Sequence, residues 1–278
     1  MAKVQQTIAG EAAMNIFELP LPFETPRHIR RPLRDPYDKA HGDGYKPSRT
    51  AATMNLATRS TFPGVKVLRN HEALSMQKLR AILHFSFSPY VVDIREEYPL
   101  CSLESHYRAK AHGVSVPESE QTICNLNLAL VLPPDFRLHY HTVSLGSKAD
   151  ETGLPLSPRD RREYALSLER GWTWQKVNGD RFTKKEYGNN LLMSRWISQV
   201  NIWKYQESAR ALADRVKTRS LRGTLAHVLE RHARHMGISV DHAFELFAVA
   251  VSFGFLYIDH TEYLRVDMPL VLRGVLDG

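Results

Sequence analysis

The chain has 278 residues, of which 43% are hydrophobic, a formal net charge of +7, and only two cysteines, Cys101 and Cys124. The length suits two domains, and two cysteines form neither a disulfide framework nor a cysteine-based zinc set. No apolar run approaches the roughly 18 residues of a membrane span, and the first residues lack the pattern of a secretory signal, so we expect a cytoplasmic protein without a membrane partner.

Residues 1–60 are predicted to form a basic, proline-rich arm. Proline disfavours both helix interiors and sheet ladders, so this region is expected to be extended. The basic balance of the chain favours an anionic partner, with nucleic acid first. The arm either lies along DNA phosphates or is a solvated leader; its candidate phosphate ligands are Arg27, Arg30, Arg31 and Arg34.

Residues 61–203 are predicted to form an α/β domain. Apolar periodicity indicates a first helix within 71–86, followed by strands over 88–100, 123–132 and 136–145. Ser157 and Pro158 are a typical N-cap and first residue for a second helix over 157–170. A short strand over 171–177 and a helix over 191–205 complete the unit.

Residues 204–278 are predicted to form a small, mainly helical domain. Helices over 224–237 and 239–254 precede a predicted hairpin over 255–272, which is the order of a winged helix. Arg231 and Arg234 belong to a cationic helix face that either contacts DNA phosphates or is simply solvated. Lys148 is a further candidate DNA ligand.

Four phrases carry a family resemblance: RHIRRPLR at 27–34, FPGVKV at 62–67, SPYVVDIREEYPL at 88–100 and ALSLERGWTW at 165–174. With them, the chain resembles TnsA, the endonuclease subunit of heteromeric bacterial transposases. The resemblance implies a restriction-endonuclease-like nuclease domain followed by a small winged-helix-like C-terminal domain. It also implies three partners: double-stranded DNA at transposon ends, a TnsB-like transposase that joins the 3′ ends, and a TnsC-like AAA+ ATPase.

The catalytic positions of that family fall on uncharged residues here. The family has a glutamate on the first helix, an aspartate in the second strand and a Gln-x-Lys in the third. These positions correspond to Gln77, Asn127, and Thr142 with Ser144. Because Mg²⁺ in such a site is held by carboxylates, we expect no catalytic residues, no metal and no cofactor, and a subunit that binds DNA and holds its partners.

Two alternatives remain open. The first is an active, Mg²⁺-dependent endonuclease that cuts transposon 5′ ends with relocated groups. Its candidates are Glu96 and Glu97, which are expected on opposite faces of their strand, and Lys148; an acid on the later helix, such as Glu163, is a further option. The second is a winged-helix DNA-binding regulator that has no transposase partner.

Overall fold

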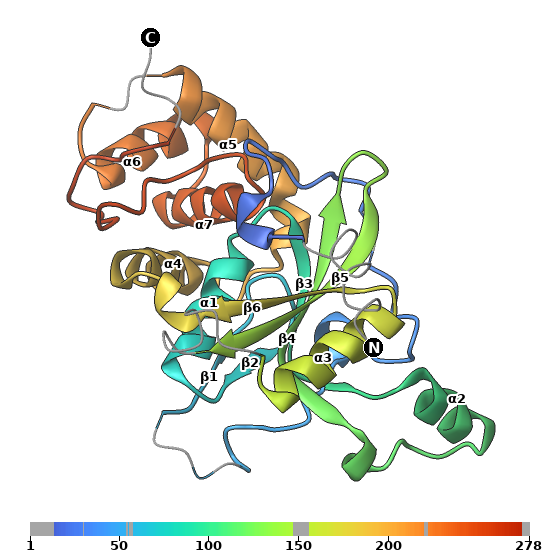
Figure 1. Cartoon of the computed structure of the whole chain (residues 1–278). Coiled ribbons are helices and arrows are strands. Elements are labelled where there is room, and N and C mark those ends of the chain that lie inside the picture. The colour runs from blue at the N-terminus through green and yellow to red at the C-terminus, as the bar shows by residue number, and fades with distance from the viewer. Residues whose placement is uncertain are drawn as a thin grey trace.

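The computed structural model describes residues 14–29, 31–53, 55, 58–146, 156–219 and 222–273. Arg30 and Lys148, both predicted to contact DNA, lie outside the described residues. An α/β layer with a central sheet lies below a group of helices from the C-terminal part of the chain (Figure 1). Across the described residues, no helix is both long and apolar enough to cross a membrane.

The central sheet has four strands in the order β3-β4-β5-β6. They are β3 (Val91–Leu100), β4 (Thr122–Leu132), β5 (Arg137–Gly146) and β6 (Thr173–Asn178). The first two pairings are antiparallel and β5 pairs parallel to β6. The parallel pair requires a crossover, which α3 (Pro158–Glu169) provides. The predicted α/β class and the three central strands are therefore confirmed.

The helices α1 (Met76–Ser86) and α3 cover opposite faces of this sheet. Leu126 and Leu128 of β4 share a buried cluster with Ile82 of α1. Ala129, at the alternate position of β4, shares another with Leu166 of α3. Because successive side chains of a strand point to opposite faces, this alternation divides the core into an α1 side and an α3 side.

Several element boundaries differ from the predictions. The first helix starts at Met76, since the Ser75 hydroxyl accepts the Lys78 amide, and the preceding β2 (Asn70–Ala73) pairs with β1 (Ser60–Pro63). A helix that was not predicted, α2 (Leu103–Ala111), follows β3. The predicted helix over 191–205 is instead α4 (Lys184–Trp196), a turn, and a short 3-10 helix over Ile202–Tyr205.

The C-terminal part contains α5 (Gln206–Thr218), α6 (Leu225–Met236) and α7 (Val240–Ser252). Gly237 ends α6 in the left-handed conformation with φ of 66°, as its position after the periodic residues predicts. The predicted hairpin over 255–272 does not form regular strands. Isolated bridges join Ile258 to Leu272 and Thr224 to Pro269, so this segment is a loop pinned at two points.

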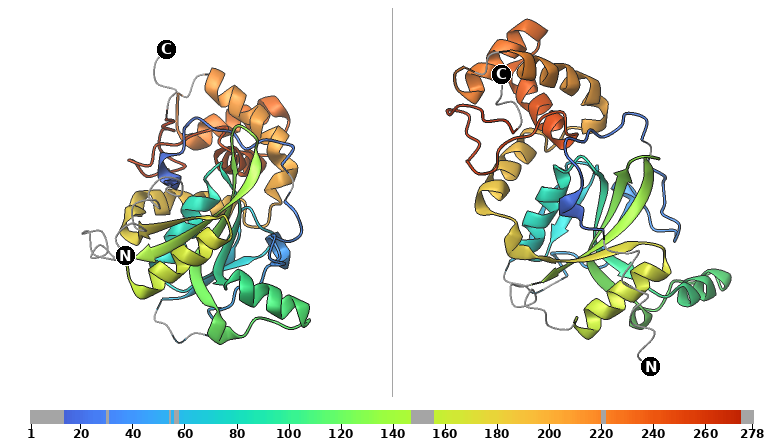
Figure 2. Two further views of the ribbon diagram at one scale, coloured as in Figure 1. Left: turned by 45° about the vertical axis from the view of Figure 1, so that its right-hand side comes forward. Right: turned by 45° about the horizontal axis from the view of Figure 1, so that its top comes forward.

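The helical layer and the α/β layer share a continuous apolar core. Val65 and Phe87 belong to the same buried cluster as Phe247 of α7, and Met193 of α4 joins them. Residues 20–25 also reach the far end of the chain, because the Thr25 amide donates to the Phe253 carbonyl at 3.0 Å. The N-terminal arm, the sheet and the C-terminal helices are thus packed together (Figure 2).

We predict that Ser157→Ala lowers the free energy of unfolding by about 1 kcal/mol. The Ser157 hydroxyl accepts the Asp160 amide and the Asp160 carboxylate accepts the Ser157 amide, which is a complete capping box for α3. Urea unfolding followed by circular dichroism measures the change. Ser208→Ala, at an exposed position in the first turn of α5 that is not the N-cap, is the matched control and should cost nothing. An equal loss in both variants would contradict the capping role.

Candidate functional site

Three of the four residues predicted from the family resemblance to mark a degenerate site lie together on the α3 side of the sheet. Asn127 of β4 pairs with Thr142 of β5, and the Asn127 amide donates to the Thr142 hydroxyl at 3.4 Å. Ser144 lies two residues further along β5, where its hydroxyl contacts the Glu163 carboxylate of α3. The Trp174 indole N–H donates to the same hydroxyl at 2.9 Å. All three residues are buried.

Gln77 is separated from these three. Gln77 lies in the first turn of α1. The Gln77 side chain packs closely against Gly179, which directly follows β6: a Cβ atom added to Gly179 would lie only 2.5 Å from the Gln77 Cδ. The β5 residues that pack on the α1 side are Val143 and Leu145, not Thr142 and Ser144. The prediction that all four residues lie at one site is therefore wrong for Gln77, because the sheet separates Gln77 from Asn127, Thr142 and Ser144.

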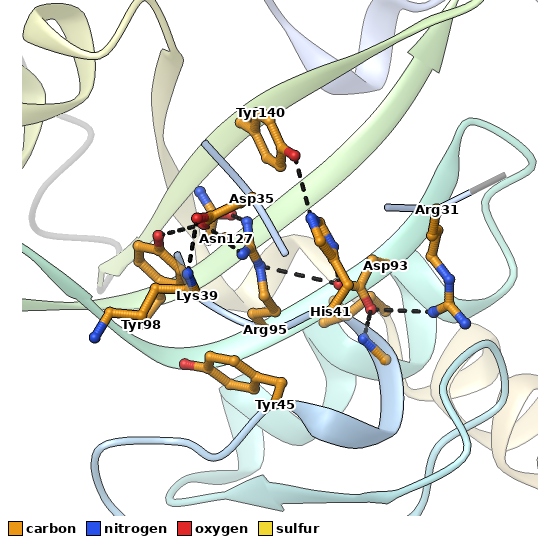
Figure 3. Close-up of polar contacts among 12 residues, drawn as sticks. Arg31, Asp35, Lys39, His41, Tyr45, Asp93, Arg95, Tyr98, Asn127 and Tyr140 are labelled. Atoms are coloured by element: carbon orange, nitrogen blue, oxygen red, sulfur yellow. Dashed lines mark hydrogen bonds and ion pairs between the residues drawn. The ribbon is translucent and has the colours of Figure 1, made fainter. Parts of the chain in front are cut away.

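A buried guanidinium occupies the space beside Asn127 (Figure 3). Arg95 of β3 is fully buried, and its Nη2 donates to the Asn127 Oδ1 at 2.5 Å. Its Nη1 donates to the Asp35 Oδ2 at 2.6 Å, and the Tyr98 hydroxyl donates to the same oxygen at 2.6 Å. The charge of Arg95 is thus balanced by Asp35 from the arm, and the neutral amide of Asn127 accepts from one of its N–H groups, while its buried Nε has no hydrogen-bond partner among the described residues.

A second cluster fixes the arm beside the first. The Asp93 carboxylate accepts from His41 Nδ1 at 2.6 Å, from the Gly42 amide at 3.3 Å and from Arg31 Nη1 at 3.3 Å. Burial alone would raise the pKa of Asp93, but the His41 hydrogen bond and the charges of Arg95 and Arg31 outweigh it and hold the pKa below its ordinary value. Asp93 is therefore ionised inside the protein.

These contacts change the role expected for the arm. The Arg31 side chain is only 20% exposed and also donates to the carbonyls of Lys66 and Val92, so it stabilises the fold and does not face a phosphate. Arg27 and Arg34 remain at the surface; Arg27 lies 3.7 Å from the Glu207 carboxylate, and Arg34 donates to the Asp38 carbonyl. Residues 31–45 cover the sheet.

Glu96, a fallback catalytic candidate, is fully engaged by cations. Arg69 donates to its two oxygens at 2.6 and 2.7 Å, His71 lies 3.0 Å away, and the Glu72 amide donates at 2.9 Å. Burial opposes ionisation, but the charge of His71 and the hydrogen bonds from Arg69 and His71 bring the pKa far below its ordinary value of 4.5. All of these contacts hold the anion inside the fold.

Glu97, the other candidate, pairs with the ammonium of Lys78 on α1. Its φ of 50° interrupts the strand alternation. Both carboxylates consequently contact residues on the side of α1 and β2, which corrects the expectation that they face opposite sides. In the part of the chain that the structure describes, no three His, Cys, Asp or Glu side chains form a group able to hold a metal ion.

The predicted cationic face of α6 is only partly exposed. Arg234 is 77% exposed and pairs with Glu230 at 3.3 Å, whereas Arg231 is half-buried. His232 points into the core, and burial followed by the charges of Arg231 and Arg215 lowers its pKa. Arg234 is therefore the α6 residue best placed to meet an anionic partner.

Comparisons with known proteins add no identification. No protein-family model matches the chain, and no curated protein is significantly similar to it in sequence.

We predict that Glu96→Gln lowers the free energy of unfolding at pH 7 by about 3–5 kcal/mol, because Arg69 and His71 lose a buried anion. Since the folded pKa of Glu96 lies below its ordinary 4.5, its stabilisation is present above pH 4.5 and lost as the pH falls below it. Denaturant titrations from about pH 7 to 3 should show a shallower acid loss in the variant than in the unchanged protein.

Glu104→Gln is the matched control, because the Glu104 side chain is 86% exposed. Its unfolding free energy should stay within about 0.5 kcal/mol of the unchanged protein at every pH. If the free energy of unfolding depended on pH in the same way in the Glu96 variant and the unchanged protein, Glu96 would not be the source of the acid sensitivity.

Proposed function

We propose that this chain is a TnsA-like subunit of a DNA transposition complex that binds transposon-end DNA and holds its partners without cutting. One observation supports the proposal that the protein does not cleave DNA: the Asn127 carboxamide, at the position of the family's strand aspartate, is bound to the buried guanidinium of Arg95. A cation already stands where a metal ion would be needed, and the nearest carboxylate, Asp35, neutralises that cation.

The arrangement does not fit Mg²⁺. This ion prefers anionic oxygens in near-octahedral geometry, and Asn127, Thr142 and Ser144 supply only neutral ones. Glu163, the acid nearest to Ser144, is held by Arg159 at 2.8 Å. A metal entering here would also meet the fixed positive charge of Arg95 at short range. We therefore propose that no DNA hydrolysis takes place on the α3 side of the sheet.

The order of elements supports the fold part of the proposal. Apart from α2, which is inserted between β3 and β4, the order is a helix, three antiparallel strands, a second helix and a parallel fourth strand. This order agrees with a restriction-endonuclease-like core, with α1 and α3 on opposite faces. The sequence of α6, α7 and a pinned loop over 255–272 agrees with a winged-helix-like domain whose wing lacks regular strands. In this proposal the protein works in the cytoplasm with a TnsB-like transposase and a TnsC-like AAA+ ATPase.

We predict that the purified protein makes no 5′ nick in transposon-end DNA with Mg²⁺ or Mn²⁺, even when a TnsB-like transposase and a TnsC-like ATPase are added. Asn127→Asp should not create cleavage, because the new carboxylate would pair with Arg95 and not with a metal. Denaturing gels of end-labelled duplex measure nicking. Mn²⁺-dependent nicking that is lost in a Glu96 or Glu97 variant would overturn the proposal in favour of a relocated nuclease site.

Contact with DNA is expected to depend on exposed arginines. Arg27→Gln combined with Arg234→Gln should weaken binding to duplex DNA and reduce the slope of log K against log salt by about 2, roughly one per lost phosphate contact. Fluorescence anisotropy at several salt concentrations measures both quantities. Arg108→Gln on α2, where Arg108 pairs with Glu120 at 2.5 Å, removes one carboxylate-paired surface arginine at another place; it is the control for such a loss and should bind normally.

Equal behaviour of the double variant and the control would exclude these arginines as phosphate ligands. Tight, sequence-specific binding by the chain alone, without any effect of the transposase or ATPase, would favour the winged-helix regulator.

A further inference from the structure

A small cavity lies beside the network of Figure 3, where the arm, the end of β3, α2 and the end of α3 meet. Its volume is about 320 Å³, close to the lower limit for small-molecule sites in proteins. The side chains that line it with charge or hydrogen-bonding capacity include Arg170, His106, Lys39, Lys110 and Asp38.

Arg170, the residue that caps α3, is the unusual member of this lining. It is 8% exposed, yet no carboxylate of the described residues lies within 4.0 Å of its guanidinium. Its Nη2 donates to the Cys101 sulfur at 3.2 Å, while its Nε and Nη1 are buried without a partner. Buried guanidinium groups are normally paired with an anion, so this one is incompletely satisfied.

Aromatic rings hold this guanidinium in place. The Arg170 Cζ lies 4.5 Å from the centre of the Tyr37 ring and 5.4 Å from that of Trp172. Rings above and beside a guanidinium stabilise its charge through their faces but do not accept its N–H groups. The Nε and Nη1 donors of Arg170 consequently have no acceptor among the described residues, and a ligand oxygen that enters the cavity and reaches them would supply one.

The surroundings of Arg170 are positive. Lys39 and Lys110 also line the cavity, and Asp38, which pairs with Lys110 at 2.8 Å, is the only acid in the lining of the described chain. Three cations and one carboxylate leave a net charge of +2, with His106 neutral at pH 7 because burial and then the charge of Arg170 lower its pKa. The His106 Nε2 is a further buried atom without a partner.

We propose that this cavity binds a small phosphate-bearing ligand through Arg170, with Lys39 and Lys110 at its rim. A phosphate monoester carries about −1.5 to −2 at pH 7 and so matches the net charge of the lining, which a single carboxylate would not. Arginine donors suit phosphate oxygens in fixed geometry. This inference is independent of transposition and of the DNA contacts proposed above.

The test uses the full chain with inorganic phosphate and with acetate at constant ionic strength. Phosphate should raise the Tm and give a calorimetric Kd in the millimolar range or below, and acetate should bind at least about tenfold more weakly. In Arg170→Met, phosphate affinity should fall at least about tenfold, while circular dichroism shows an unchanged fold. Arg161→Met, on the exposed face of α3, should bind phosphate normally.

A variant that does not depend on Arg170 keeps the test decisive if Arg170→Met fails to fold. Lys39→Met combined with Lys110→Met removes two rim cations and should weaken phosphate binding several-fold, and by a larger factor than it weakens acetate binding, because phosphate carries more charge. The proposal is overturned if about 10 mM phosphate has no effect on the unchanged protein. It is equally overturned if phosphate and acetate bind alike, or if the Arg170 and lysine variants bind phosphate as the unchanged protein does.

Discussion

The fully buried charge of Arg95 is the constraint on which the centre of this structure depends. A guanidinium removed from water needs a countercharge and acceptors for its N–H groups, and losing one partner of such a pair costs about 3–5 kcal/mol. Asp35 supplies the countercharge and Asn127 a second acceptor, while the rings of Tyr98 and Tyr140 lie 4.6 and 5.3 Å from its Cζ. The arm must therefore lie over the sheet for the sheet to be stable.

This constraint also explains why an amide suits position 127. Arg95 and Asp35 already form a neutral pair, and Asp93 is balanced by Arg31 and His41. An aspartate at 127 would add a second anion to the Arg95 pair with no additional cation in contact. The carboxamide instead accepts from Arg95 and donates to Thr142 without changing the charge. Asn127 is thus part of a charge-balanced interior.

Local signals in the sequence predicted the sheet and several helices correctly. They failed where the structure depends on contacts between residues that are far apart in the sequence. Ser157 and Pro158 mark the start of α3, and Gly237 marks the end of α6, because capping depends on neighbours along the chain. The arm contains no such signal: Asp35 and Arg95 are 60 residues apart and meet only in the folded chain. The same holds for β2, whose residues join β1 and not the helix that follows.

The candidate site shows the same division. Strand alternation correctly groups Asn127, Thr142 and Ser144, since residues of paired strands share a face at fixed intervals. It could not place Gln77, because the face of the sheet that α1 covers is set by tertiary packing. It also failed at Glu97, where a positive φ breaks the alternation that the sequence shows no sign of losing.

The burial of several arginines limits which residues could contact DNA in the proposed function. Arg31, Arg69 and Arg95 are each bound to a carboxylate inside the protein, so these pairs cancel within the net charge of +7 and are occupied by the fold. The excess positive charge of the chain therefore comes from other residues. In the proposed function, contact with a duplex depends on cations at the surface, such as Arg27 and Arg234, whose attraction to phosphates is screened by salt within about 10 Å at 0.1 M.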